Sequence, residues 1–302
     1  MSLNKEKAPD LAGKVIFITG GTAGIGAETL RQLSKQNPAH IFFTGRDSER
    51  ASTLIQVVNQ LAPKTQLTFL ECDHGSLSTV KSAAERFIAA STRLDILICN
   101  AGIMAEPTGL TKDRYEVQFG VNHMAHALFM KKLLPTLQQT AGEPDADVRI
   151  LLLTSISFRF HPTGGICFDE LKTTQDLGVT GAWLRYGQSK LANAVYAREL
   201  DRRFPEILSI SIHPGIVKTN LVGNLGFFDK AFVYLANFRQ LVDTAHGAHN
   251  TLWAATSDRS KIWNGQMYDP VGKLTEKLNV AVQDDGLATR LWEWTDKELE
   301  GY

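Results

Sequence analysis

A tyrosine and a lysine in the second half of the chain have the types and spacing of a proton-transfer site. Tyr186 and Lys190 begin and end the sequence YGQSK, and residues four apart lie on the same face of a helix. A free phenol has a pKa of about 10, and a neighbouring ammonium favours its ionised form. The pair could therefore act as an acid or a base, although the same spacing also occurs on amphipathic helices that do no chemistry.

A glycine-rich turn near the N-terminus has the composition of a phosphate-binding loop. The apolar run 15–18 leads into the sequence TGGTAGIG, and a helical pattern follows. Glycines in such a turn let a pyrophosphate approach the amides and the positive end of the helix dipole. The Gly-x-x-x-Gly-x-Gly spacing differs from the GxGxxG fingerprint, and a turn of this kind can be purely structural. Because it follows the first strand-like run, we interpret it as a nucleotide site formed by Gly20, Thr22, Ala23, Gly24, Ile25 and Gly26.

The second apolar run ends in Thr44-Gly45-Arg46-Asp47. Dinucleotide-binding folds usually present an acidic residue here, which hydrogen-bonds the ribose 2′-hydroxyl. Gly45 occupies that place and Arg46 follows, and a guanidinium suits a 2′-phosphate. The sequence therefore favours NADP over NAD. The alternative is a solvated Arg46 that pairs locally with Asp47 or Glu49.

Polar residues also follow the later apolar runs. Asp73 could accept a hydrogen bond from an adenine amino group, or it could be the N-cap of a helix that begins near Ser76. Ser155 follows the run 150–153, where a hydroxyl points toward a ligand crevice or merely caps a turn. These residues are candidate contacts for a cofactor and a substrate.

Asn122 lies within an apolar helical pattern, where an unpaired amide is costly. We expect it to be either a structural clamp or part of a proton relay. His123 and His126 are close by but have no carboxylate or cysteine companions, so we expect no metal site.

The elements that must position these residues alternate along the chain. Short strand-like runs are separated by longer helical patterns, which implies right-handed βαβ crossovers and a doubly wound, mainly parallel sheet of the α/β class. Ligands of such sheets lie at the carboxyl ends of the strands, where the polar motifs fall. The predicted strands are 15–18, 41–44, 67–72, 96–99, 150–154 and 208–213.

Composition narrows the class of partner. The 302 residues are 43% hydrophobic, with 32 acidic and 32 basic residues, so we expect a globular protein whose partners are small molecules rather than nucleic acid. The three cysteines, Cys72, Cys99 and Cys167, are too few and too scattered for a disulfide framework, which favours a reduced, cytoplasmic location. No run of the sequence has the length of a signal peptide core or a membrane span.

Together these residues resemble the ordered signatures of the short-chain dehydrogenases/reductases. The signatures are TGGTAGIG, CNAG, Asn122, Ser155, the YGQSK pair and HPGIVKT, and they extend from about residue 13 to 220. The segment between Ser155 and Tyr186, and the LWEW sequence near the C-terminus, are similar to the retinol-dehydrogenase-like and WW-domain-oxidoreductase-like branch. Two departures stand out. Cys99 replaces the usual first Asn of NNAG, and Thr22-Ala23 lacks the basic residue that some NADP-dependent members carry.

The resemblance implies a fold and a role for each residue. It implies a single NADP-binding Rossmann-type domain over 1–302 with about seven strands and substrate-loop insertions at about 156–185 and 220–242. Tyr186 would be the general acid or base, and Lys190 would lower the pKa of Tyr186 and hold the nicotinamide ribose. Ser155 would hydrogen-bond the substrate oxygen, and Asn122 would anchor a relay water. The remaining cofactor contacts it implies are Asp73, Asn100, Ile216 and Thr219.

The expected activity is hydride transfer between NADP(H) and a carbonyl or alcohol. Aromatic residues outside the core pattern favour a bulky apolar or aromatic substrate, although core packing or contacts within a homo-oligomer would explain some of them. The alternatives are a reductase of a C=N or activated C=C bond, and a non-catalytic NADP-binding sensor. The aromatic residues in question are Phe158, Phe160, Trp183, Phe227, Phe228, Phe232, Tyr234 and Phe238.

Overall fold

The computed structural model describes residues 10–217 and 241–302 of the chain. An eight-stranded sheet has the order β10-β9-β6-β5-β4-β1-β2-β3. The pairs from β3 to β9 are parallel, and β10 pairs antiparallel with β9 at the edge. The strands are β1 Val15–Ile18, β2 His40–Gly45, β3 Gln66–Glu71, β4 Ile96–Cys99, β5 Arg149–Leu153, β6 Leu208–Ile212, β9 Met267–Asp269 and β10 Lys273–Leu274. A separate parallel pair consists of β7 Ile216–Val217 and β8 Leu241–Val242.

The central strands are rich in apolar side chains, and β1 and β4 are apolar on both faces. Every residue of β1, β4, β5 and β6 is buried, as expected for parallel strands with helices on both sides. The six predicted runs are confirmed as strands, with ends that differ by one residue at most. The sheet has eight strands, close to the expected count of about seven, and its strands β9 and β10 lie outside the six predicted runs.

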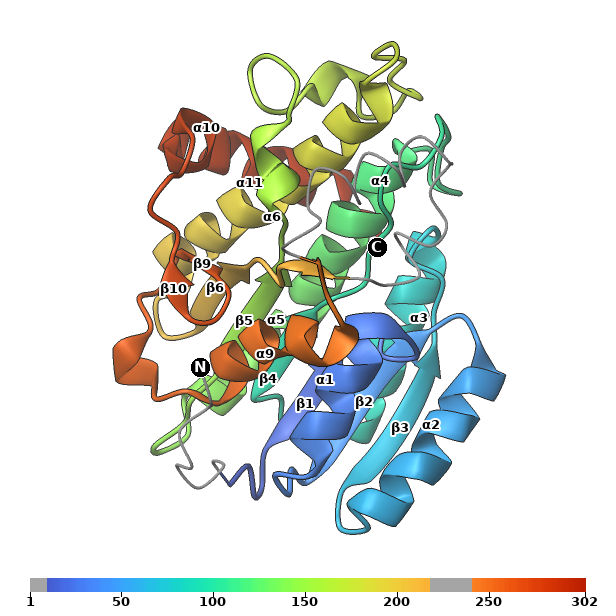
Figure 1. Cartoon of the computed structure of the whole chain (residues 1–302), viewed down its shortest axis with the longest axis vertical. Helices are drawn as coiled ribbons and strands as arrows, with labels where there is room; N and C mark the ends of the chain where they lie inside the picture. The colour runs from blue at the N-terminus through green and yellow to red at the C-terminus, as the bar shows by residue number, and fades with distance from the viewer. Residues whose placement is uncertain (1–9, 218–240) are drawn as a thin grey trace.

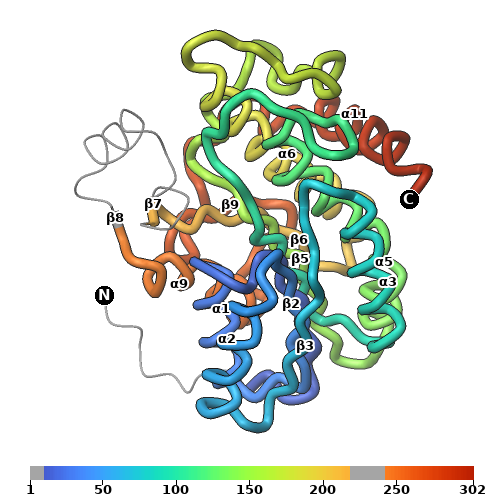
Figure 2. Tube along the Cα trace, turned by 90° about the vertical axis from the view of Figure 1, so that its right-hand side faces the viewer, coloured from blue at the N-terminus to red at the C-terminus, as the bar shows by residue number. Residues whose placement is uncertain are grey.

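Two layers of helices enclose the sheet (Figures 1 and 2). One layer contains α1, α2 and α9, and the other contains α3, α5 and α6, with α11 packed on the outer side of α6. The longer helices are α1 Gly24–Ser34, α2 Ser48–Leu61, α3 Leu77–Ala90, α5 Ala125–Ala141, α6 Gly181–Arg203, α9 Thr244–Thr256 and α11 Asp285–Glu298. The short helical turns are α4 Val117–Phe119, the π-helix η1 Gly120–Met124, the 3₁₀ turns η2 Ile156–Arg159, η3 Phe168–Glu170 and η4 Arg259–Lys261, and α10 Val280–Gln283.

The strand order reverses at the centre of the sheet, where β1 and β4 are neighbours. From β1 the chain proceeds outward to β2 and β3, and from β4 it proceeds the other way to β5 and β6. Such a reversal leaves a crevice at the carboxyl ends of the strands, because the connecting helices leave on opposite faces. This is a Rossmann-type fold. None of the helices in the described part of the chain is long and apolar enough to span a membrane.

Candidate active site

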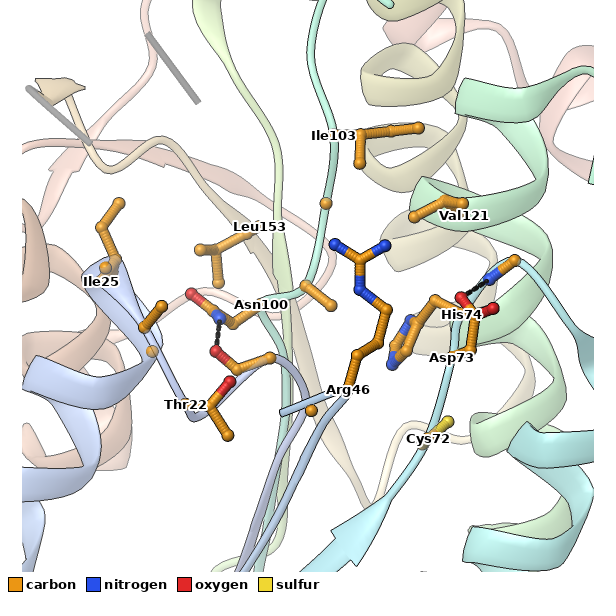
Figure 3. A pocket seen from close by; sticks show the side chains of 18 of the residues that line it. Thr22, Ile25, Arg46, Cys72, Asp73, His74, Asn100, Ile103, Val121 and Leu153 are labelled. Atoms are coloured by element: carbon orange, nitrogen blue, oxygen red, sulfur yellow. Dashed lines mark hydrogen bonds between the residues drawn. The ribbon is translucent and has the colours of Figure 1, made fainter. Parts of the chain in front are cut away.

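A cavity of about 590 Å³ lies at the carboxyl ends of the central strands (Figure 3). The glycine turn, Arg46, Asp73, Asn100, Tyr186 and Lys190 all contribute to its walls. Residues from five parts of the sequence thus meet at one place, the crevice that the strand order predicts.

The glycine turn fits a phosphate group closely. Gly20 and Gly24 have φ angles of 65° and 56°, which residues with a β-carbon rarely adopt. A β-carbon at Gly26 would collide with the Gly20 carbonyl oxygen and the Asn100 amide. The N-cap of α1 is Ala23, which offers no side-chain acceptor to the first helical amides. The N-terminus of this 11-residue helix is therefore left open for an anion, as in nucleotide-binding turns.

Arg46 is exposed at the end of β2 and lines the cavity. Figure 3 shows its guanidinium extending into the cavity beside the His74 ring. The local pairing considered from the sequence does not form. Asp47 instead caps α2 by accepting from the Arg50 amide at 2.9 Å, and its Oδ2 lies 3.0 Å from Arg50 Nε. Arg46 makes no ion pair within residues 10–217 or 241–302, and its charge is available to a ligand.

Arg50 also lines this cavity, and the sequence interpretation missed it. The α2 helix begins at Ser48, and Arg50 in its first turn lines the cavity together with Arg46 while its guanidinium pairs with Asp47. The signal was present in the sequence as a second arginine four residues after the first.

Asp73 and Asn100 both lie at strand ends facing the cavity (Figure 3). Asp73 Oδ1 accepts from the Gly75 amide at 2.9 Å, and the N-cap residue of α3 is Ser76. The N-cap alternative for Asp73 is therefore wrong. Asn100 Nδ2 donates to the carbonyl oxygens of Thr19 and Gly20 at 2.8 and 3.3 Å, so this side chain fixes the glycine turn to the end of β4.

Tyr186 and Lys190 lie on α6 and both line the cavity. Lys190 Nζ is 5.8 Å from the centre of the Tyr186 ring and donates to the Leu153 carbonyl oxygen at 3.1 Å. Ser155, which follows β5, hydrogen-bonds the Tyr186 side chain. Its Oγ also accepts from the Ser157 amide at 3.2 Å, which caps the η2 turn. The turn-cap interpretation of Ser155 is confirmed, and its role as a crevice hydroxyl stays a prediction.

Burial dominates the electrostatics of this pair. Tyr186 and Lys190 are only 6% and 5% exposed. Burial raises the pKa of Tyr186 to about 12, and the hydrogen bond with Ser155 opposes this effect. Burial also lowers the pKa of Lys190 to about 8. At neutral pH the tyrosine is therefore a protonated acid beside a lysine that is still a cation.

Asn122 is a clamp. It lies in the π-helix η1 and is fully buried. Its Oδ1 accepts from the Ile103 amide at 2.8 Å, and its Nδ2 donates to the Ile103 carbonyl oxygen at 3.0 Å and to Ser189 Oγ at 2.9 Å. Asn122 therefore ties the loop after β4 to the helix that carries Tyr186.

The peptide oxygen of Asn122 accepts from His126 Nδ1 at 2.8 Å and from Asn193 Nδ2 at 3.1 Å. His126 Nε2 contacts Thr19 Oγ1 at 2.9 Å, and that hydroxyl accepts from the amides of Asn100 and Ala101. Burial lowers the pKa of His126, which keeps the imidazole neutral. This histidine therefore joins the glycine turn to the π-helix.

Apolar side chains also gather near Tyr186. Met104, Ala105, Trp183 and Ile216 are partly buried members of one hydrophobic cluster, and the Trp183 ring stands perpendicular to the Tyr186 ring with 6.3 Å between their centres. Of the other aromatic candidates, Phe158 is buried in the main core whereas Phe160 is 63% exposed. The predicted cofactor contact Thr219 and the aromatic residues Phe227, Phe228, Phe232, Tyr234 and Phe238 lie outside the described residues.

Comparisons with known proteins agree with this geometry. The family model for short chain dehydrogenase matches residues 14–147. An uncharacterized oxidoreductase of Schizosaccharomyces pombe is 35% identical over 97% of this chain and 86% of its own length. The short-chain dehydrogenase/reductase drtF of Aspergillus calidoustus is 31% identical over 96% of this chain and 95% of its own length.

A solved structure from Mycobacterium paratuberculosis has a similar fold. It superposes with a TM-score of 0.71 and 26% identity, covering 97% of this chain and 95% of the other. These relatives match nearly the whole chain, beyond the part that the family model covers. The chain is therefore an oxidoreductase of the short-chain dehydrogenase/reductase family.

Proposed function

We propose that this oxidoreductase transfers a hydride between NADP(H) and a carbonyl or alcohol, and that it works chiefly as a carbonyl reductase. One observation carries the proposal. Tyr186, hydrogen-bonded to Ser155, and Lys190 line the same cavity as the open glycine turn and the unpaired Arg46. A proton donor therefore lies at one end of a space that can hold a phosphorylated dinucleotide.

The chain's residues divide the work of holding the cofactor. The amides of the glycine turn would bind the pyrophosphate, Arg46 and Arg50 would bind the 2′-phosphate, and Lys190 would bind the nicotinamide ribose. Asp73 would contact the adenine end of the cofactor, and Asn100 would support the glycine turn. Ile216 and Thr219 would bind the nicotinamide amide. When bound, the cofactor supplies the hydride.

Proton transfer belongs to Tyr186. Because burial raises its pKa to about 12, the phenol is protonated at neutral pH and can donate its proton to the oxygen of a carbonyl group whose carbon gains a hydride. Ser155 would donate a hydrogen bond to the same oxygen as negative charge develops there. The protonated phenol is the form from which carbonyl reduction starts, whereas alcohol oxidation would start from the phenolate.

The substrate would be a bulky apolar or aromatic ketone or aldehyde. The apolar residues described near Tyr186 include the ring of Trp183, which suits apolar groups on a carbonyl carbon. The segments 156–185 and 220–242 would act as substrate loops of a single domain. We also keep the cytoplasmic location as a proposal, which subcellular fractionation of the tagged protein would test.

A substrate screen with an active-site variant tests the function. Ketones, aldehydes, imines and enones would be offered with NADPH and followed by NADPH absorbance. Wild type should reduce bulky ketones or aldehydes, and Tyr186→Phe should lose about 100-fold or more in turnover while NADPH binding is retained. Reduction of imines or enones alone, no turnover of any substrate, or wild-type turnover by Tyr186→Phe would each contradict the proposal.

A further inference from the structure

Arg185, the residue before Tyr186, carries a buried guanidinium that contacts two loops far apart in the sequence. The residue is 2% exposed. Its Nη1 donates to the Gln175 carbonyl oxygen and its Nη2 to the Glu106 carbonyl oxygen, both at 3.0 Å. Gln175 and Glu106 both lie outside α6, so the guanidinium connects this helix to two loops.

A buried carboxylate holds this guanidinium in place. Glu116 is fully buried, and its Oε1 lies 3.2 Å from Arg185 Nε. The two atoms are not aligned as a hydrogen bond, so the contact is mainly electrostatic. Glu116 is itself fixed, because its Oε2 accepts from the Phe119 amide at 2.7 Å and its own amide donates to the Leu171 carbonyl oxygen at 2.8 Å. Removing one partner of such a pair leaves the other charge buried and unpaired.

Both loops adopt a backbone conformation that their residues disfavour. Gln175 has a φ of 47° and Ala105 a φ of 51°, in the left-handed region where a β-carbon meets the following carbonyl oxygen. Residues in this region persist when the surrounding structure fixes them. The two carbonyl groups that Arg185 binds belong to Gln175 itself and to Glu106, the residue directly after Ala105. The guanidinium therefore holds both strained turns at once.

The strained turn at Ala105 is flanked by residues that line the cavity. Met104 and Ala105 belong to the cluster with Trp183 and Ile216, and Ile103 and Glu106 line the cavity itself. If the turn relaxed, these side chains would move relative to the Tyr186 hydroxyl. The glycine turn and Arg46 lie on other strands and would not move with it.

We propose that Arg185 is a positioning residue that holds the Ala105 and Gln175 turns in their left-handed conformation and so preforms the apolar substrate wall. The inference rests on the proposed reductase function, because it assigns that wall to the substrate. The proposal predicts that binding of a bulky carbonyl compound depends on Arg185, whereas binding of the cofactor does not.

The test combines a clamp variant with a rescue by glycine. In Arg185→Lys the charge is kept, but one ammonium cannot contact three partners in a planar fork. The KM for bulky apolar ketones should rise about tenfold, with a smaller change in kcat and an NADPH Kd within about twofold of wild type. Adding Ala105→Gly should recover at least about a third of the lost affinity, because glycine adopts a positive φ without the steric cost. Asp145→Gly is the matched control, since Asp145 has a φ of 56° in an exposed loop, and it should not rescue.

Hydrogen exchange gives a measure that does not depend on activity. The amides of residues 103–106 and 173–178 should exchange faster in Arg185→Lys, and Ala105→Gly should slow the first group only. If Arg185→Lys does not fold, Glu116→Gln keeps the shape of its side chain and should show the same pattern more weakly. The proposal would be overturned if neither the exchange nor the KM changed. It would also be overturned by an NADPH Kd that rises as much as the KM, or by equal rescue with Asp145→Gly. A wild type without any reductase activity would refute the proposed function, whereas the exchange measurement would still decide whether Arg185 holds the turns.

Discussion

Replacing Lys190 by methionine is expected to stabilise the cofactor-free protein while weakening its binding of NADPH. Lys190 is 5% exposed, and burial lowers the pKa of its ammonium from 10.5 to about 8. At 1.36 kcal/mol per pKa unit, this difference corresponds to about 3.4 kcal/mol of unfavourable free energy for the charged form in the folded state. Methionine removes the charge but also the hydrogen bond to the Leu153 carbonyl oxygen, which contributes about 1 kcal/mol. The net gain in the free energy of unfolding at pH 7 should be about 2 kcal/mol.

The gain should depend on pH in a defined direction. Below about pH 8 the lysine is charged in both the folded and the unfolded protein, so its cost is fully present. Between about pH 8 and 10.5 the folded protein has released the proton and the unfolded protein still binds it, so wild-type stability rises with pH through this interval. The advantage of Lys190→Met over wild type should therefore shrink as the pH rises from 8 to 10.5.

Urea unfolding at about pH 7 and about pH 9.5 measures both effects, and a fluorescence titration measures the expected loss of NADPH affinity. Lys64→Met serves as the control, because Lys64 is exposed on the surface and its replacement should change little at either pH. A Lys190→Met protein less stable than wild type at pH 7, or an advantage that is equal at both pH values, would refute the electrostatic argument.

Three further predictions concern the same cavity. Arg46→Ala should raise the NADPH Kd about tenfold or more and leave the NADH Kd nearly unchanged, since hydrogen bonds to charged groups contribute about 1.5 to 3 kcal/mol. Arg50→Ala should have the same effect to a smaller extent. A wild type that binds both cofactors equally would contradict this prediction. Gly45→Asp should turn the preference toward NADH only together with Thr22→Ala, because a β-carbon at position 45 would lie 2.5 Å from Thr22 Cγ2, and Kd values for the single and double variants decide it. Gly187→Ala should lower kcat without changing the NADPH Kd, because a β-carbon there would collide with the Phe160 carbonyl oxygen and displace the turn that carries Ser155. If Gly187→Ala lowers kcat by the same factor in a Ser155→Ala background, the substitution acts elsewhere.

The strands and the principal cavity residues were predictable because both depend on local sequence. A strand such as Val15–Ile18, buried on two faces, is a continuous apolar run in the sequence, and the polar residue after each run must lie at the carboxyl edge of a parallel sheet. Tyr186 and Lys190 needed only the helical repeat to share a face. The edge strand Lys273–Leu274 was missed because it is exposed and only two residues long, and so carries no periodicity.

What the sequence could not supply were contacts between distant segments. The amide of Asn122 could have served a clamp or a relay, and only the position of Ile103, 19 residues earlier, shows that it acts as a clamp, while the relay role stays a prediction. Arg50 reaches the cavity because α2 begins at Ser48, a boundary that propensity alone does not fix. The left-handed turns at Ala105 and Gln175 are contacted by Arg185, which lies on α6. Neither alanine nor glutamine is a residue type that predicts such a conformation.

The hydrogen bonds at the Asn122 carbonyl restrict how a proton could return to Tyr186. A carbonyl oxygen has two lone pairs, and His126 and Asn193 already occupy both on Asn122. The side-chain Oδ1 of Asn122 accepts one hydrogen bond, from the Ile103 amide, within the described residues, which leaves it a lone pair for a water molecule that relays protons to Lys190. Gly102 lines the cavity beside these atoms, and a β-carbon there would lie 3.0 Å from that Oδ1 and 3.4 Å from Lys190 Nζ. Any side chain at residue 102 would therefore crowd both the Asn122 amide and the catalytic lysine.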